Sequence, residues 1–190
     1  FTNYVRQYTD MPLLVVLEEH DKNSLKSTRF LRASDLTSNL GQENNPEWKT
    51  IGINEGSDEL VSPLGSIGYR WGEDGKWNID EREGKDGKET KLQLSLIGND
   101  VSAVSFPNFS ADASNEHWTA GGHDEVLIKN IPTKTIKGAK GKELVVETVY
   151  DLMMASYGLD RGLGGGNVAS SFDDDIPGTP AWQEKITGVS

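Results

Sequence analysis

The chain has 190 residues, with 19 Lys and Arg against 30 Asp and Glu, a formal net charge of −11 and no cysteine. This length suits about one domain with a sizeable buried core, and the negative charge makes nucleic acid and anionic membrane surfaces poor partners. The absence of cysteine excludes disulfides, thiolate zinc sites and cysteine-ligated iron–sulfur clusters. No apolar run approaches the ~20 residues that cross a bilayer, so no transmembrane helix is expected.

The N-terminal part holds the most hydrophobic segment. The run Pro12–Leu17 is short, continuous and rich in β-branched residues, which predicts a strand buried on both faces. Residues Arg29–Arg32 are expected to continue a hairpin, and Ser34 to cap a short helix that ends near Gly41. Because the chain starts at Phe1 with no translation start or signal peptide, we expect a piece of a longer polypeptide.

The middle of the chain is predicted to be rich in β-structure. Turn pairs at Asp74-Gly75 and Asp86-Gly87 favour two hairpins, and a third is expected from Val126–Ile136 and Glu143–Val149. The other short apolar segments of this part, each bounded by turn residues, are Trp48–Ile53, Glu59–Val61, Ile67–Trp71, Lys91–Ile97 and Val101–Phe106. This alternation of short apolar segments and turn residues predicts an insert made largely of short strands.

Helices are predicted near the C-terminus. A threonine cap and a glycine stop mark Thr148–Gly158, and Thr179–Gly188 adds proline at its first helical position. The segment Gly162–Asp175 between them reads as a loop. The fold class is therefore α+β or α/β, with a β-rich insert of several hairpins plus short helices. The expected organisation is a strand and a short helix over residues 1–40, a β-rich insert over 41–149, and a helix, a Gly/Asp loop and a terminal helix over 150–190.

Metal chemistry has weak support in the sequence. The pairs Glu116-His117 and His123-Asp124 could supply four ligands, but a solvated loop is the favoured interpretation. The acidic runs Asp80–Asp86 and Asp173–Asp175 lack the glycine and glutamate positions of a calcium loop. His20 stands apart from both pairs. No metal-ligating and no catalytic residue is predicted.

Other functional motifs are also absent. Gly162–Gly166 lacks the flanking strand and helix of a dinucleotide site, and Gly65–Gly68 is not a nucleophile elbow. Dispersed tryptophans are more often packing anchors than ligand contacts; they are Trp48, Trp71, Trp77, Trp118 and Trp182. The residues alone thus predict an acidic, mostly β module without an active site of its own.

A series of motifs nevertheless resembles one family in the same order along nearly the whole chain. These motifs are Tyr8–Val15, Gly41–Thr50, Gly65–Gly72, Gly75–Asn78, Leu92–Leu96, Thr148–Leu152, Thr179–Trp182 and Ile186–Ser190. Together they resemble the alpha subunit of respiratory, membrane-bound nitrate reductases, in the molybdopterin oxidoreductase (dimethyl sulfoxide reductase) superfamily. The resemblance implies an internal fragment of a larger molybdopterin oxidoreductase fold.

The resemblance also implies a chemistry for the parent enzyme. Such enzymes hold molybdenum between two pterin guanine dinucleotides with an iron–sulfur cluster nearby, and reduce nitrate to nitrite with quinol-derived electrons in nitrate respiration. The implied partners are the remainder of the alpha subunit, an iron–sulfur beta subunit and a membrane cytochrome b gamma subunit, at the cytoplasmic face of the membrane. The family holds molybdenum through an aspartate in an earlier part of the subunit and the cluster through a histidine and cysteines near its N-terminus, so neither centre is expected to assemble on this chain, which has no cysteine. Asp10 and Asp151 are not assigned as the metal ligand, because their surroundings do not match that motif, and they stay structural or indirect candidates. The fragment alone is expected to be inactive and without cofactor.

Two residues are candidates for an indirect cofactor role. Thr9 and Asp10 precede the predicted buried strand, where short polar side chains can cap the backbone and face a crevice. The alternative is a turn locked by its own hydrogen bonds. A rival function is a free-standing acidic β-rich binding module, with its ligand at Trp71, Trp77 or the loop 116–124.

Overall fold

The computed structural model of the chain describes residues 1–21, 23–63, 91–107, 126–176 and 178–189. In chain order its helices and strands are α1 (Thr2–Tyr8), β1 (Leu14–Asp21), β2 (Ser24–Phe30), β3 (Gly52–Ile53), β4 (Leu60–Val61), β5 (Asp100–Pro107), β6 (Val126–Lys137), β7 (Glu143–Thr148), α2 (Val149–Ser156) and α3 (Pro180–Thr187). This mixture of strands and short helices confirms the α+β alternative. Within the ranges given, no helix has the length and apolarity needed to cross a membrane.

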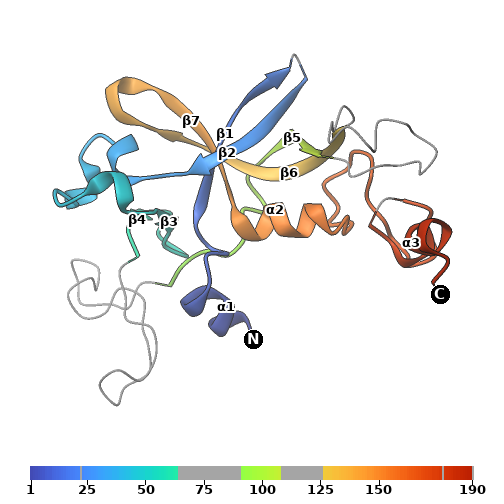
Figure 1. Cartoon of the computed structure of the whole chain (residues 1–190). Coiled ribbons are helices and arrows are strands. Elements are labelled where there is room, and N and C mark those ends of the chain that lie inside the picture. The colour runs from blue at the N-terminus through green and yellow to red at the C-terminus, as the bar shows by residue number, and fades with distance from the viewer. Residues whose placement is uncertain (22, 64–90, 108–125, 177, 190) are drawn as a thin grey trace.

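Five strands close into a barrel in the order β1-β2-β5-β6-β7, and β7 returns to pair with β1 (Figure 1). All neighbours are antiparallel except β2 and β5, which meet in parallel at Leu25 and Val104. A separate two-stranded sheet joins β3 to β4. The barrel thus brings the N-terminal hairpin together with strands more than 70 residues further along the chain.

Strand β1 pairs with β2 on one side and with β7 on the other. Its first four residues are buried and its last four are exposed, so the prediction of a strand buried on both faces holds for Leu14–Leu17. Alternate side chains enter two clusters, with Leu14 and Val16 in one and Leu17 in the other. The apolar run at the start of β1 thus connects both parts of the core.

Several predicted elements are confirmed. The hairpin of β6 and β7 forms around a 3-10 turn at Ala139–Gly141, and α2 and α3 begin at the threonine caps expected for them. Pro132 lies in β6 opposite Val101 of β5, whereas β7 pairs with β6 only from Lys134 onward. The missing proline N–H therefore removes no hydrogen bond to β7.

Two predictions about local structure are wrong. The segment from Ser34 to Gly41 is not an α-helix: it forms two short 3-10 turns, and Leu40 has φ of 49°. Lys91–Ile97 does not form a strand beyond a single bridge between Leu92 and Asn54. Helix α1 had no counterpart among the predictions. The hairpins expected at Asp74-Gly75 and Asp86-Gly87, with the strand at Ile67–Trp71, lie outside the described residues.

Candidate functional site

Helix α2 begins with a cap that also holds a distant segment. The Thr148 hydroxyl accepts a hydrogen bond from the Asp151 backbone N–H at 3.1 Å and donates to the Leu94 carbonyl at 2.9 Å. Such a cap satisfies one of the backbone donors that the first turn of a helix leaves free. Here it also fixes the segment 91–97 against the start of α2.

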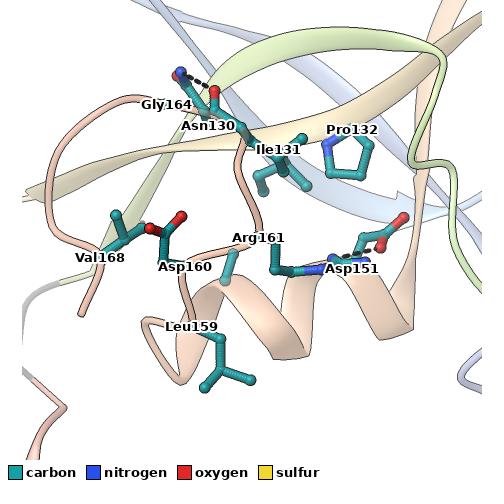
Figure 2. Close-up of a pocket in the computed structure, with 11 residues that line it drawn as sticks. Asn130, Ile131, Pro132, Asp151, Leu159, Asp160, Arg161, Gly164 and Val168 are labelled. Atoms are coloured by element: carbon teal, nitrogen blue, oxygen red, sulfur yellow. Dashed lines mark hydrogen bonds and ion pairs between the residues drawn. The ribbon is translucent and has the colours of Figure 1, made fainter. Parts of the chain in front are cut away.

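The side chain of Asp151 is the centre of a buried polar cluster. It is fully buried, and its Oδ1 accepts hydrogen bonds from Ser95 Oγ at 2.8 Å and from Arg161 Nη1 at 2.7 Å. Its Oδ2 accepts from the Leu96 backbone N–H at 2.8 Å. Figure 2 shows the Arg161 side chain extending toward Asp151 at α2. Three donors thus engage this carboxylate, two from the segment 91–97 and one from the loop after α2.

Arg161 completes the cluster. Its Nη2 donates to Ser95 Oγ at 2.9 Å, and its guanidinium lies 5.6 Å from the centre of the Tyr150 ring. The Arg161 side chain is 15% exposed. We name Ser95, Asp151 and Arg161 the polar clamp, because these side chains join the segment 91–97, helix α2 and the loop after α2. Its chemistry is structural: every charge in it is used to hold chain segments together.

A second buried carboxyl lies close to the clamp. Glu147, the second-to-last residue of strand β7, has no exposed surface, and neither carboxyl oxygen has a hydrogen-bond partner in the described part of the chain. Burial, and to a lesser degree the charge of Asp151, raises the pKa of Glu147 to about 9. The side chain is therefore neutral at pH 7.

A narrow cavity lies between β6 and the loop that follows α2 (Figure 2). Its accessible volume is about 10 Å³, which is room for about one water molecule and excludes a cofactor. The glycine-rich part of this loop is tied to β6, because Asn130 Nδ2 donates to the Leu163 carbonyl at 3.0 Å and Asn167 Nδ2 donates to the Ile128 carbonyl at 3.3 Å. The predicted loop is therefore present and anchored to the barrel.

An open groove of about 540 Å³ runs beside α1 and the polar clamp. Arg6 lines it, and its Nη2 lies 3.0 Å from Glu55 Oε1, while Lys91 Nζ lies 2.6 Å from Glu55 Oε2. The hydrogen bond from Lys91 leads the effects that hold the pKa of Glu55 below its usual value. Opposite charges in the groove are therefore already paired with one another.

The candidates Thr9 and Asp10 lie at the end of α1, outside the lining of both cavities. The Thr9 hydroxyl donates to the Val5 carbonyl and accepts from the Met11 backbone N–H at 3.2 Å, and the Asp10 carbonyl accepts from the Leu13 N–H at 2.9 Å. These bonds are those of a turn that closes on itself. The Asp10 side chain is exposed.

No group of three or more His, Asp or Glu side chains that could hold a metal exists among the residues with described positions. The loop containing Glu116-His117 and His123-Asp124 lies outside them. In the Asp173–Asp175 run, Asp174 accepts backbone hydrogen bonds from Ser170 and Ser171, and Asp175 forms an ion pair with Lys185. Asp174 therefore holds a turn and Asp175 an ion pair.

Sequence reasoning did not find the polar clamp as a unit. It singled out Asp151 without a role, and it gave none to Ser95, Arg161 or Glu147. The only local signal was the threonine cap before α2, which fixes the backbone around Asp151. Ser95 lies 56 residues before Asp151, so no spacing rule within one helix or strand could connect them.

No family model matches the chain. It is 53% identical over its whole length to the respiratory nitrate reductase 1 alpha chain of Escherichia coli K12, 47% identical to the respiratory nitrate reductase 2 alpha chain of that strain, and 42% identical to a respiratory nitrate reductase alpha chain of Bradyrhizobium. The chain spans about 15% of the length of the first two relatives and 17% of the third.

The chain is therefore homologous, from end to end, to one segment of a large oxidoreductase chain. Along its whole length it aligns with nitrate reductase alpha chains, at 34–53% identity. The family resemblance expected from the ordered motifs is thereby confirmed.

Proposed function

We propose that the chain is an internal fragment of the catalytic alpha chain of a respiratory nitrate reductase, and that it serves as scaffold around the cofactor and substrate passage. The whole enzyme would reduce nitrate to nitrite by oxygen-atom transfer with quinol-derived electrons. The observation that carries this proposal is the 53% identity over all of the chain to a protein of which it spans 15%. A scaffold role is supported by the polar clamp, whose charges are all engaged between segments.

We infer that neither redox centre of such an enzyme is held by this chain. The sequence has no cysteine for an iron–sulfur cluster, and the described residues contain no metal-ligand group of three or more acidic or histidine side chains. In this proposal, molybdenum with its two pterin guanine dinucleotides and the iron–sulfur cluster are held by other parts of the longer chain. No chemical step is assigned to residues of this segment.

Thr9 and Asp10 are proposed to lie near the pterin cofactor without ligating the metal. The bonds of the Thr9 hydroxyl fix the turn, and this leaves the exposed Asp10 carboxylate presented from a rigid backbone. A carboxylate held in this way can orient a hydrogen-bond donor of a neighbouring group. Asp10→Asn in the complete enzyme should lower the rate of nitrate reduction while leaving the bound molybdenum unchanged.

The proposal extends to partners and location. The remainder of the alpha chain, an iron–sulfur beta subunit and a membrane cytochrome b gamma subunit would surround the segment at the cytoplasmic face of the membrane. Support comes from the names of the relatives, which are alpha chains of respiratory enzymes. Purification of the native complex and identification of its subunits by mass spectrometry tests this arrangement.

The main test has two parts: the metal content and activity of the isolated chain, and the extent of the reading frame that encodes it. We expect the purified 190 residues to contain neither molybdenum nor iron by elemental analysis and to reduce no nitrate with a dye electron donor. We expect the reading frame to continue on both sides, with a cysteine-rich stretch upstream. Turnover by the isolated chain, or a gene that encodes only these residues, would refute the proposal and favour a free-standing binding module.

A further inference from the structure

Helix α3 has no buried residue along its eight residues, Pro180–Thr187. Its ends are well formed: the Thr179 hydroxyl accepts from the Trp182 N–H at 3.2 Å, and Gly188 closes the helix with φ of 68°. Isolated helices shorter than ~12–15 residues are marginal in water, because tertiary packing supplies most of their stability. In Figure 1 the helix lies apart from the barrel, beyond the loop that follows α2. A helix this short and this uncovered needs a packing partner.

Large apolar side chains are exposed on and near this helix. A groove of about 420 Å³ between the end of α2, the following loop and the start of α3 is bordered by Tyr157, Leu159 and Phe172, which are 63%, 48% and 79% exposed. Ile186 of α3 is 43% exposed, and Val189 just beyond it is 67% exposed. We name these five residues the C-terminal apolar surface. Exposed apolar groups that border one groove, as Tyr157, Leu159 and Phe172 do, mark a contact surface.

Charge selects the kind of partner. Exposed acidic side chains are sequence neighbours of the apolar ones: Asp160 follows Leu159, Asp173 follows Phe172, and Glu184 precedes Ile186 by two positions. The exposed Lys185 between them is paired with Asp175, and the chain as a whole carries a net charge of −11. A second copy would bring the same acidic residues and the same net charge, which disfavours self-association through this face. An apolar segment flanked by Lys or Arg is complementary to it.

We propose that the C-terminal apolar surface is the docking face for an apolar, basic-flanked segment from the remainder of the longer alpha chain. This inference rests on the proposed function and adds to it the surface through which the segment is held. The chain spans about 15% of its relatives' length, so about 85% of such a chain is available to supply the partner. Docking would bury Phe172 and Ile186 and would stabilise α3.

Amide hydrogen exchange tests the proposal without any substitution. The backbone amides of α3 and of residues 169–172 are compared between the isolated 190 residues and the complete alpha chain. We expect exchange to be at least 100-fold slower in the complete chain at these amides. Equal exchange rates in the two proteins would overturn the proposal, as would a stable dimer of the isolated chain that protects the same amides.

Substitutions provide a second measurement. In the complete chain, Phe172→Asp and Ile186→Asp should each lower the melting temperature by several degrees, while the exposed control Gln183→Asp should leave it unchanged. In the isolated chain all three variants should melt within about one degree of the parent. Complete-chain variants at Phe172 and Ile186 that match Gln183→Asp would refute the docking face.

Nitrate reduction by the complete chain, assayed in parallel, separates this inference from the proposed function. An active complete chain with unprotected α3 amides refutes only the docking face. An inactive complete chain with protected α3 amides refutes only the assignment as a nitrate reductase. The two ideas can therefore fail independently.

Discussion

Arg161 Nη1 lies 2.7 Å from Oδ1 of the fully buried Asp151, so one ion pair joins the first turn of α2 to the loop that follows the helix. Ser95 bonds to both side chains and brings the segment 91–97 into the same contact. A buried charge is stabilising only while its partner and its hydrogen bonds remain in place. The polar clamp should therefore be the most sensitive polar feature of this chain.

Arg161→Leu should lower the free energy of unfolding by about 3 to 5 kcal/mol, because it leaves the Asp151 carboxylate buried without its cation. Urea denaturation at pH 7 measures the change. The matched control is Lys185→Leu, which removes an exposed ion pair with Asp175 and should cost less than about 1 kcal/mol. Similar losses of unfolding free energy in the two variants would show that the clamp contributes no more to stability than an exposed ion pair.

Glu147 should make stability depend on pH. Its pKa is raised from 4.5 to about 9 in the folded chain, so the folded state binds the proton more tightly than the unfolded state. The contribution of Glu147 to the free energy of unfolding is then greatest below pH 4.5 and falls as the pH rises from 4.5 to 9; about 3 kcal/mol of it is lost at pH 7. Unfolding free energies measured across this range in the parent chain test the slope.

Glu147→Gln should remove this slope, because the amide has the shape of the protonated acid and no charge to gain. The variant should match the parent near pH 4 and exceed its stability at pH 7 and above. The exposed Glu143 on the same strand gives the control Glu143→Gln, which should keep the parental slope. Parallel pH curves for the parent and Glu147→Gln would contradict the assignment of a neutral buried acid.

Gly165→Ala should destabilise the loop after α2. Gly165 has φ of 87°, and an added Cβ would lie 2.9 Å from Cγ and Nδ2 of Asn130, the side chain that holds the Leu163 carbonyl. We expect a loss of more than about 1 kcal/mol in urea denaturation. Gly166→Ala, where an added Cβ meets no atom within 4 Å, should change little.

Thr148→Ala should cost about 2 kcal/mol, because it removes the cap of α2 and leaves the Leu94 carbonyl without the hydroxyl that donates to it. Thermal unfolding followed by circular dichroism measures the loss. Thr187→Ala removes a hydroxyl bond on the exposed surface of α3 and is the control. A melting temperature for Thr148→Ala as high as that of Thr187→Ala would show that the cap is not essential.

Elements that depend on local signals could be predicted from the sequence. The apolar run before Glu18 identified β1, and the threonine caps at Thr148 and Thr179 identified both C-terminal helices. Each signal acts within a few residues: burial of consecutive side chains in a strand, or one hydroxyl satisfying a backbone N–H three positions on. These signals do not depend on the rest of the fold.

Elements that depend on distant partners could not be predicted. Alternating leucines in Lys91–Ile97 favour a strand, but the Leu96 N–H bonds to the Asp151 carboxylate, 55 residues away, instead of to a neighbouring strand. The turn after Ser34 is held by Asp35, whose carboxylate binds Arg29 and the Arg32 N–H. In both segments side chains take the backbone bonds that regular structure would use.

The pairing of Leu14 with Thr148 makes the entry and the exit of everything between β1 and β7 immediate neighbours. A stretch whose two ends meet side by side can be added to or removed from a host polypeptide without moving the host's own elements apart. We therefore expect the barrel to be removable from the longer chain as one unit. Alpha chains trimmed at these two positions, with a short linker across the gap, would keep the path of the surrounding fold.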